Sequence, residues 1–166
     1  TLEQRGMDMN HPIYMAGIGV VIKYVMKKLQ EEFYAAVPSE IGIKEPFKVE
    51  KDIIYIPPYP YVRNELQKLS AYKGFDSDII YNYCKRFLRF AGSILPDDRL
   101  KLIKPFKEIL NKRKTVSDEI LNYARKKGHR KNESITNTLA AEIALEHSDR
   151  LLSEIISTRN MIMNLV

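Results

Sequence analysis

Residues 76–92 read DSDIIYNYCKRFLRFAG, and they give the clearest indication of a helical fold because their apolar residues recur at helical spacing. Those on one face are Ile80, Tyr83, Cys84, Phe87 and Ala91. The basic residues on the other face are Lys85, Arg86 and Arg89. Asp76 or Ser77 is a typical helix N-cap, and Gly92 is a typical stop. We therefore predict an amphipathic helix with a buried apolar face and an exposed basic face.

A second amphipathic helix is predicted over 12–36, where Pro12 suits the first helical position. Its apolar face comprises Tyr14, Ile18, Val21, Val25, Leu29 and Phe33. Gly17 and Gly19 each cost roughly 1 kcal/mol relative to alanine inside a helix. They indicate either close approach of another backbone or a ligand, or a bend or frayed first turn.

Further helices are predicted after Pro60. Their expected limits are Tyr61 to Lys73, Asp97 or Asp98 onward, Thr115 to Gly128, and Ser134 to the C-terminus. Pro105 should kink or split the helix that begins near Asp97. The last helix is expected to bury a seam of Leu145, Leu152, Ile155 and Ile162.

Five prolines interrupt the segment between the first two helical regions, at Pro38, Pro46, Pro57, Pro58 and Pro60. Residues 48–56 alternate imperfectly and could form one short strand; because one strand alone has no partner, we expect an extended arm or a small ribbon at most. We therefore expect an all-α fold in three parts. They are an N-terminal helical arm over 1–37, a proline-rich extended connector over 38–60, and a C-terminal antiparallel helical bundle over 61–166.

The formal net charge of +6 favours a polyanionic partner such as DNA, RNA or an acidic membrane surface. The charge is gathered in four clusters. They are Lys23, Lys27 and Lys28; Lys85, Arg86 and Arg89; Lys112, Arg113 and Lys114; and Arg125, Lys126, Lys127, Arg130 and Lys131. The last two bracket one short helix, roughly 20 Å apart, a spacing that suits two phosphate contacts on one duplex. Alternatively, these lysines and arginines simply solvate surface faces and helix ends.

No pattern of catalytic residues stands out. His11, His129 and His147 share no ligand spacing, and neither phosphate-loop motif is present. Cys84 lies in an apolar stripe and has no histidine near it in sequence, which favours a buried thiol over a nucleophile. We therefore expect no enzyme activity, metal or cofactor.

One cysteine allows no internal disulfide, so the chain is expected in an intracellular nucleoprotein or a virion, not among disulfide-stabilised secreted proteins. The most apolar run, 13–22, is about half the ~20 residues that a transmembrane helix needs. No transmembrane segment is therefore predicted.

A helix-turn-helix is a second interpretation of the basic helix. Residues 61–73, the turn Gly74-Phe75-Asp76 and residues 77–91 have the right lengths for that motif. The residues that would then meet a major groove are Tyr81, Asn82, Lys85, Arg86 and Arg89.

The order of basic helical arm, kinked connector and helical bundle, with an Ile/Lys/Tyr-rich composition, resembles the coat proteins of filamentous archaeal viruses. That resemblance implies an arm that wraps DNA, with Lys23, Lys27 and Lys28 on phosphates, and Gly17 and Gly19 allowing close packing in a filament. Separately, residues 79–90, IIYNYCKRFLRF, followed by GSILP over 92–96, resemble the helical domain of a GINS replication-complex subunit.

These features together favour a non-enzymatic structural protein that self-associates and packages nucleic acid, most readily duplex DNA, through phosphate contacts. The alternatives are a helix-turn-helix regulator and a helical subunit of a replication or other nucleoprotein complex.

Overall fold

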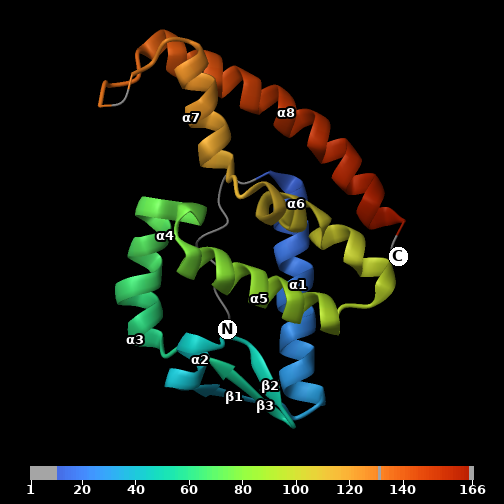
Figure 1. Cartoon of the computed structure of the whole chain (residues 1–166). Coiled ribbons are helices and arrows are strands. Elements are labelled where there is room, and N and C mark those ends of the chain that lie inside the picture. The colour runs from blue at the N-terminus through green and yellow to red at the C-terminus, as the bar shows by residue number, and fades with distance from the viewer. Residues whose placement is uncertain (1–10, 131, 165–166) are drawn as a thin grey trace. The chain divides into compact units, whose positions relative to one another are not determined.

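The computed structural model describes residues 11–130 and 132–164. Helices account for 75% of the described residues and strands for 7%, so the expected predominance of helix is confirmed, with one small sheet added (Figure 1). The chain divides into two compact units. One is Gly17–Arg113, and the other joins the described residues of 1–16 to those of 114–166.

Helix α1 (Pro12–Glu31) begins at the expected proline but ends five residues before the predicted limit. Phe33, placed by the sequence pattern on the apolar helical face, instead has a positive φ of 56° and an exposed side chain. Strand β1 (Ala35–Pro38) follows, and its pairing with a later strand overrides the helical preference of its alanines.

The proline-rich segment is not a purely extended connector, because residues 48–56 form the small ribbon that the sequence allowed and a further strand joins it. Strands β2 (Lys48–Glu50) and β3 (Ile53–Ile56) form an antiparallel hairpin, while β1 pairs with β3 in parallel. The resulting order is β1-β3-β2. Each strand has only three or four residues, so its pattern is too short to be recognised in isolation.

Phe47 packs this segment against the helix that was predicted from residues 76–92. Its ring lies 4.9 Å from the Phe87 ring and 5.3 Å from the Tyr83 ring, centroid to centroid, and stacks on Phe90 at 6.0 Å. The short helix α2 (Glu40–Lys44) is held against β3 by Gly42, where a Cβ would lie 2.0 Å from the carbonyl oxygen of Ile56.

Helix α5 (Asp78–Ile94) confirms the helix predicted from residues 76–92, and Ser77 caps it by accepting from the Ile80 N–H. A helical run leads to it through α3 (Tyr59–Tyr61), the π-helical turn η1 (Val62–Leu66) and α4 (Gln67–Lys73). The three-residue turn η2 (Gly74–Asp76) connects α4 to α5 and begins at Gly74, which has a positive φ.

The core of the larger unit forms where α5 meets α1, η3 (Asp97–Ile103) and α6 (Lys104–Lys112). Its buried members are Val21, Leu88, Ala91, Leu95, Ile103 and Leu110. Pro105 splits η3 from α6, as predicted, because it lies in the first turn of the second helix, where its missing N–H is tolerated.

Gly17 and Gly19 have different roles in α1. A Cβ on Gly17 would lie 2.6 Å from the carbonyl oxygen of Leu102 and 2.6 Å from Cε2 of Phe106. A Cβ on Gly19 would meet nothing within 4 Å. Close approach therefore explains Gly17, whereas no such contact explains Gly19.

The smaller unit is built on two helices, α7 (Val116–Lys126) and α8 (Asn137–Met163). Thr115 and Asp118 form a reciprocal capping box at the start of α7, and Gly128 follows its end with a positive φ of 91°. Arg150 of α8 donates to Glu119 of α7 at 3.1 Å. Ala124 and Leu139 are buried.

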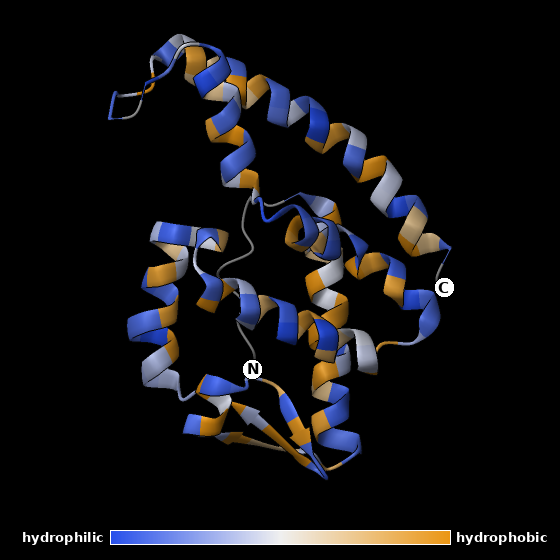
Figure 2. Cartoon of the chain, viewed as in Figure 1, coloured by the Kyte–Doolittle hydropathy of each residue, from blue (hydrophilic) through white to orange (hydrophobic). Residues whose placement is uncertain are grey.

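The predicted buried seam of α8 is wrong. Its four members, Leu145, Leu152, Ile155 and Ile162, are all exposed. The side chains that α8 turns toward the rest of its unit are instead Ile143, His147, Arg150, Glu154 and Thr158. Figure 2 shows that apolar residues recur along α8.

Substitution of the two α1 glycines by alanine should change the free energy of unfolding in opposite directions. Gly17→Ala is expected to lower the free energy of unfolding by about 1–3 kcal/mol, because backbone and ring atoms crowd the new methyl group. Gly19→Ala should raise it by about 1 kcal/mol through helix propensity. Urea unfolding followed by circular dichroism measures both changes, and equal shifts of the two variants would contradict the packing at Gly17.

Candidate nucleic-acid interface

The basic residues of α5 are exposed because the helix is capped and buried on its other side. Leu88 and Ala91 are buried in the core, and this fixes the rotation of the helix. The face left to solvent carries Asn82, Lys85, Arg86 and Arg89, with Asp78 and Ile79 at its N-terminal end and Ser93 at its C-terminal end. The predicted outward orientation of the basic residues is therefore confirmed.

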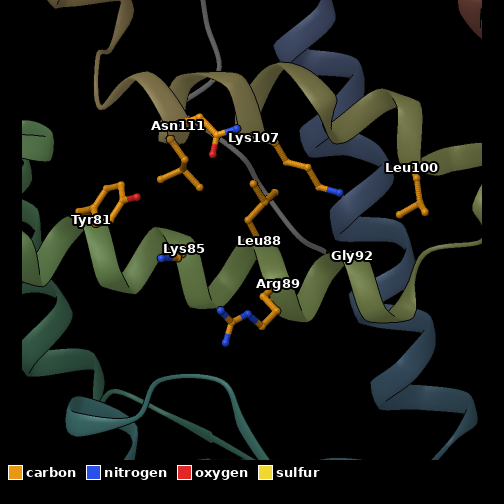
Figure 3. Close-up of a pocket in the computed structure, with 9 residues that line it drawn as sticks. Tyr81, Lys85, Leu88, Arg89, Gly92, Leu100, Lys107 and Asn111 are labelled. Carbon is orange, nitrogen blue, oxygen red and sulfur yellow. The ribbon is translucent and has the colours of Figure 1, made fainter.

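A groove of about 410 Å³ lies between α5 and α6 (Figure 3). Its apolar lining is Leu88, Gly92, Leu100 and Leu110, and its polar lining is Tyr81, Lys85, Arg89, Lys107 and Asn111. Figure 3 shows Leu88 of α5 and Lys107 of α6 extending into the space between the helices. Basic side chains of α5 and α6 therefore line the same groove as these apolar residues.

A second hollow of about 300 Å³ lies on the other side of the α5 basic face. It is lined by Arg86 and Arg89 of α5 and by Phe47 and Lys48 from the segment that enters β2. Arg89 thus borders both hollows.

The cations of this face lack acidic partners. Within 11–130 and 132–164, no carboxylate lies at ion-pair distance from Lys85, Arg86, Arg89 or Lys107. The Lys85 ammonium lies 5.7 Å from the centroid of the Tyr81 ring. The charge of this face is therefore available to an anion from outside.

The α1 cluster is different because acidic residues lie one turn away. Lys27 pairs with Glu31 at 3.5 Å, and Lys28 pairs with Glu32. The hydrogen bond to Glu32 raises the pKa of Lys28, whose ammonium also lies 4.8 Å from the Tyr34 ring centroid. Only Lys23 of the three has no carboxylate partner among the described residues.

The remaining two clusters are partly neutralised. Arg113 donates to Asp78 at 2.6 Å and stacks on Tyr81 at 4.2 Å, while Lys112 and Lys114 are exposed. Lys127 pairs with Glu142 at 2.9 Å, and this hydrogen bond raises the pKa of Lys127. Besides Lys127, the exposed cations of the last cluster are Arg125, Lys126 and Arg130; Lys131 lies outside the described residues.

The structure brings two of the three histidines together, which their sequence spacing did not indicate. His11 is buried, with Nδ1 at 3.0 Å from Oε2 of Glu154 and Nε2 at 3.4 Å from Nδ1 of His147. No group of three or more histidine, cysteine or acidic side chains within the described ranges is arranged to hold a metal ion. The contact ties the start of α1 to α8.

Lys107 and Asn111 are the groove residues that the sequence reasoning missed. They lie one turn apart on α6, as Lys85 and Arg89 do on α5. Their helical spacing is visible in the sequence, but the pairing of α6 with α5 is a tertiary contact that no local pattern reveals.

No family model matches the chain, and no curated protein or solved structure matches it either. None of the helices in the described part of the chain has both the length and the apolar character required to cross a bilayer.

Cys84 should react slowly with thiol reagents. Burial raises the pKa of its thiol, so less of the reactive thiolate forms at neutral pH than in free cysteine. Labelling by a disulfide reagent should be slow in buffer, faster as pH rises above the usual cysteine range, and fast in urea. Equal rates in buffer and urea at neutral pH would show that the α5 inner face is open.

Proposed function

We propose that this protein is a non-enzymatic structural protein that binds the phosphate backbone of nucleic acid at the α5–α6 groove. One observation carries the proposal. Lys85, Arg89 and Lys107 line a single groove, and no described carboxylate neutralises them.

Phosphate recognition fits the residue types as well as the charge. Lysine supplies a point charge, while the arginine guanidinium can donate two parallel hydrogen bonds to one phosphate. Asn111 and Tyr81 add neutral donors of the kind that position a backbone without reading sequence. Release of counterions from the phosphates then supplies most of the binding free energy.

The groove favours a duplex backbone over stacked single-stranded bases. Single-strand binding proteins stack bases on open aromatic rings. Here Arg113 lies 4.2 Å from the centroid of the Tyr81 ring, so a cation already occupies a face of the aromatic ring in the groove lining.

Packaging of nucleic acid, as in a coat protein, requires that many copies bind side by side in addition to the phosphate contacts. We include self-association in the proposal because α8 leaves a wide apolar face exposed.

Removing the groove cations should weaken DNA binding more than removing an equal charge elsewhere. The triple variant Lys85→Ala, Arg89→Ala, Lys107→Ala should reduce affinity for duplex DNA. It should also reduce the slope of log affinity against log salt by about 0.9 for each phosphate that the protein no longer neutralises. Fluorescence anisotropy with a labelled duplex of random sequence measures both.

The matched control is Lys23→Ala, Lys27→Ala, Lys28→Ala, which removes the same formal charge from α1. It should keep most of the affinity and slope, since two of its lysines are already paired with carboxylates. Equal losses in the two triple variants, or no binding of the unaltered chain at low salt, would reject the groove as the site.

A helix-turn-helix regulator is the second candidate, favoured by the order α4, η2, α5. The connecting turn has three residues, and Asn82, Arg86 and Arg89 lie on one exposed face of the second helix. Asparagine and arginine are the side chains that most often read adenine and guanine in a major groove.

Asn82→Ala and Arg86→Ala separate the two candidates. For a sequence-reading helix, they should reduce preference for a selected site by about 1–3 kcal/mol while sparing affinity for random duplex. The comparison requires a site selected from a random duplex library. Failure to select any site, or equal loss on selected and random DNA, would reject the regulator and leave backbone binding.

A further inference from the structure

Helix α8 has two opposite faces, and only one of them is in contact with the described residues of its own unit. The covered face contacts its own unit through His147, Arg150 and Glu154, and Thr158 is buried there. The opposite face carries a row of exposed residues that we name the α8 outer seam. Its members are Leu145, Asp149, Leu152, Ile156, Arg159 and Met163.

The outer seam has the spacing of a coiled-coil interface. Its members follow one another at steps of four, three, four, three and four residues, as the a and d positions of a heptad do. At 3.6 residues per turn, this row lies on the side of α8 opposite the covered face. The four apolar members are each between 61% and 67% exposed.

Two charges interrupt the apolar row. Asp149 and Arg159 are exposed, and neither has an ion-pair partner within the part of the chain that the structure describes. A partner that covered the seam would bury both charges, which is costly unless each meets its opposite. A partner that binds the seam should therefore place a basic side chain opposite Asp149 and an acidic side chain opposite Arg159.

We infer that the outer seam binds α8 of a second copy of this chain in antiparallel orientation. Centred between Leu152 and Ile156, this pairing sets Leu145 against Met163 and Asp149 against Arg159 of the other copy. Leu152 then faces Ile156, and two-fold symmetry repeats every pair. In an antiparallel coiled coil each a position faces a d position, and every pair in this register satisfies that rule.

Parallel pairing is disfavoured by the same residues. In a parallel pair each residue faces its own copy, so Asp149 would meet Asp149 and Arg159 would meet Arg159. Such like-charge contacts across an interface strongly weaken binding. The seam reads apolar, acid, apolar, apolar, base, apolar, which is complementary to itself only when one copy is reversed.

An apolar groove next to the seam widens the contact. It holds about 430 Å³ between the first turn of α1 and the C-terminal part of α8, where Ile155 and Ile162 line it with Pro12 and Met15. Specific interfaces bury about 1,000 Å² or more in total, and this border adds apolar surface to a seam that runs about 27 Å along the helix. The interface lies within the smaller unit, and it rests on the self-association that the proposed function includes.

The test exchanges the charges of the seam in the full chain. The unaltered protein should sediment with about twice the 19.3 kDa monomer mass. Asp149→Arg alone sets arginine against arginine, and Arg159→Asp alone sets acid against acid. Each should raise the dimer dissociation constant at least about tenfold. The double variant D149R/R159D restores opposite charges and should restore the dimer.

Mixing the two single variants provides the control for folding. The Asp149→Arg chain carries two arginines in the seam and the Arg159→Asp chain two acids, so equal amounts should form a heterodimer although each alone is mainly monomeric. Leu152→Asp should abolish association, while Ile79→Asp, at an exposed apolar residue of α5, should not. A monomeric unaltered chain, single variants that associate normally, or no rescue by the double variant would overturn the inference.

Discussion

The larger unit depends on the contact between the inner face of α5 and the residues that α1, η3 and α6 bring to it. Ala91 and Ile103 are fully buried at its centre. The close approach of α1 at Gly17 to the carbonyl oxygen of Leu102 allows this packing, because any side chain there would hold the helices apart. Because the apolar face of α5 is buried, the rotation of the helix about its axis is fixed. Lys85 and Arg89 therefore lie on the exposed side of α5.

The four basic clusters differ less in how many cations they contain than in how many of those cations are paired with carboxylates. The α1 lysines resemble those of α5 in sequence, yet Glu31 and Glu32 follow Lys27 and Lys28 by one turn and neutralise them. On α5 no acidic residue occupies the corresponding positions. The same distinction applies to α8, where Asp149 and Arg159 stand in an apolar row without partners among the described residues, while nearby Arg150 is paired with Glu119 and Glu154.

Local signals in the sequence predicted the helices well. Ser77 and Thr115 cap α5 and α7 as their side-chain chemistry implies, and Gly74 and Gly128 follow helix ends with positive φ. The pairing of β1 with β3 could not be predicted in this way, since the paired residues lie eighteen positions apart in the chain and each strand is short.

The error at α8 has a different physical origin. The apolar spacing of Leu145 and Leu152 is real, but both side chains are exposed. A periodic apolar row indicates a helix with an apolar face, but it does not show whether other parts of the chain cover that face. For the candidate site, the basic face of α5 was predictable from spacing, whereas Lys107 required the tertiary pairing of α6 with α5.

Lysine footprinting with and without duplex DNA tests the central claim most directly. Acetylation of each lysine, quantified by mass spectrometry, reports which side chains the DNA covers. The groove predicts strong protection of Lys85 and Lys107, with little change at Lys23 and Lys27, at a salt concentration where binding is saturated. Equal protection of all four lysines, or protection confined to α1, would contradict a phosphate site between α5 and α6.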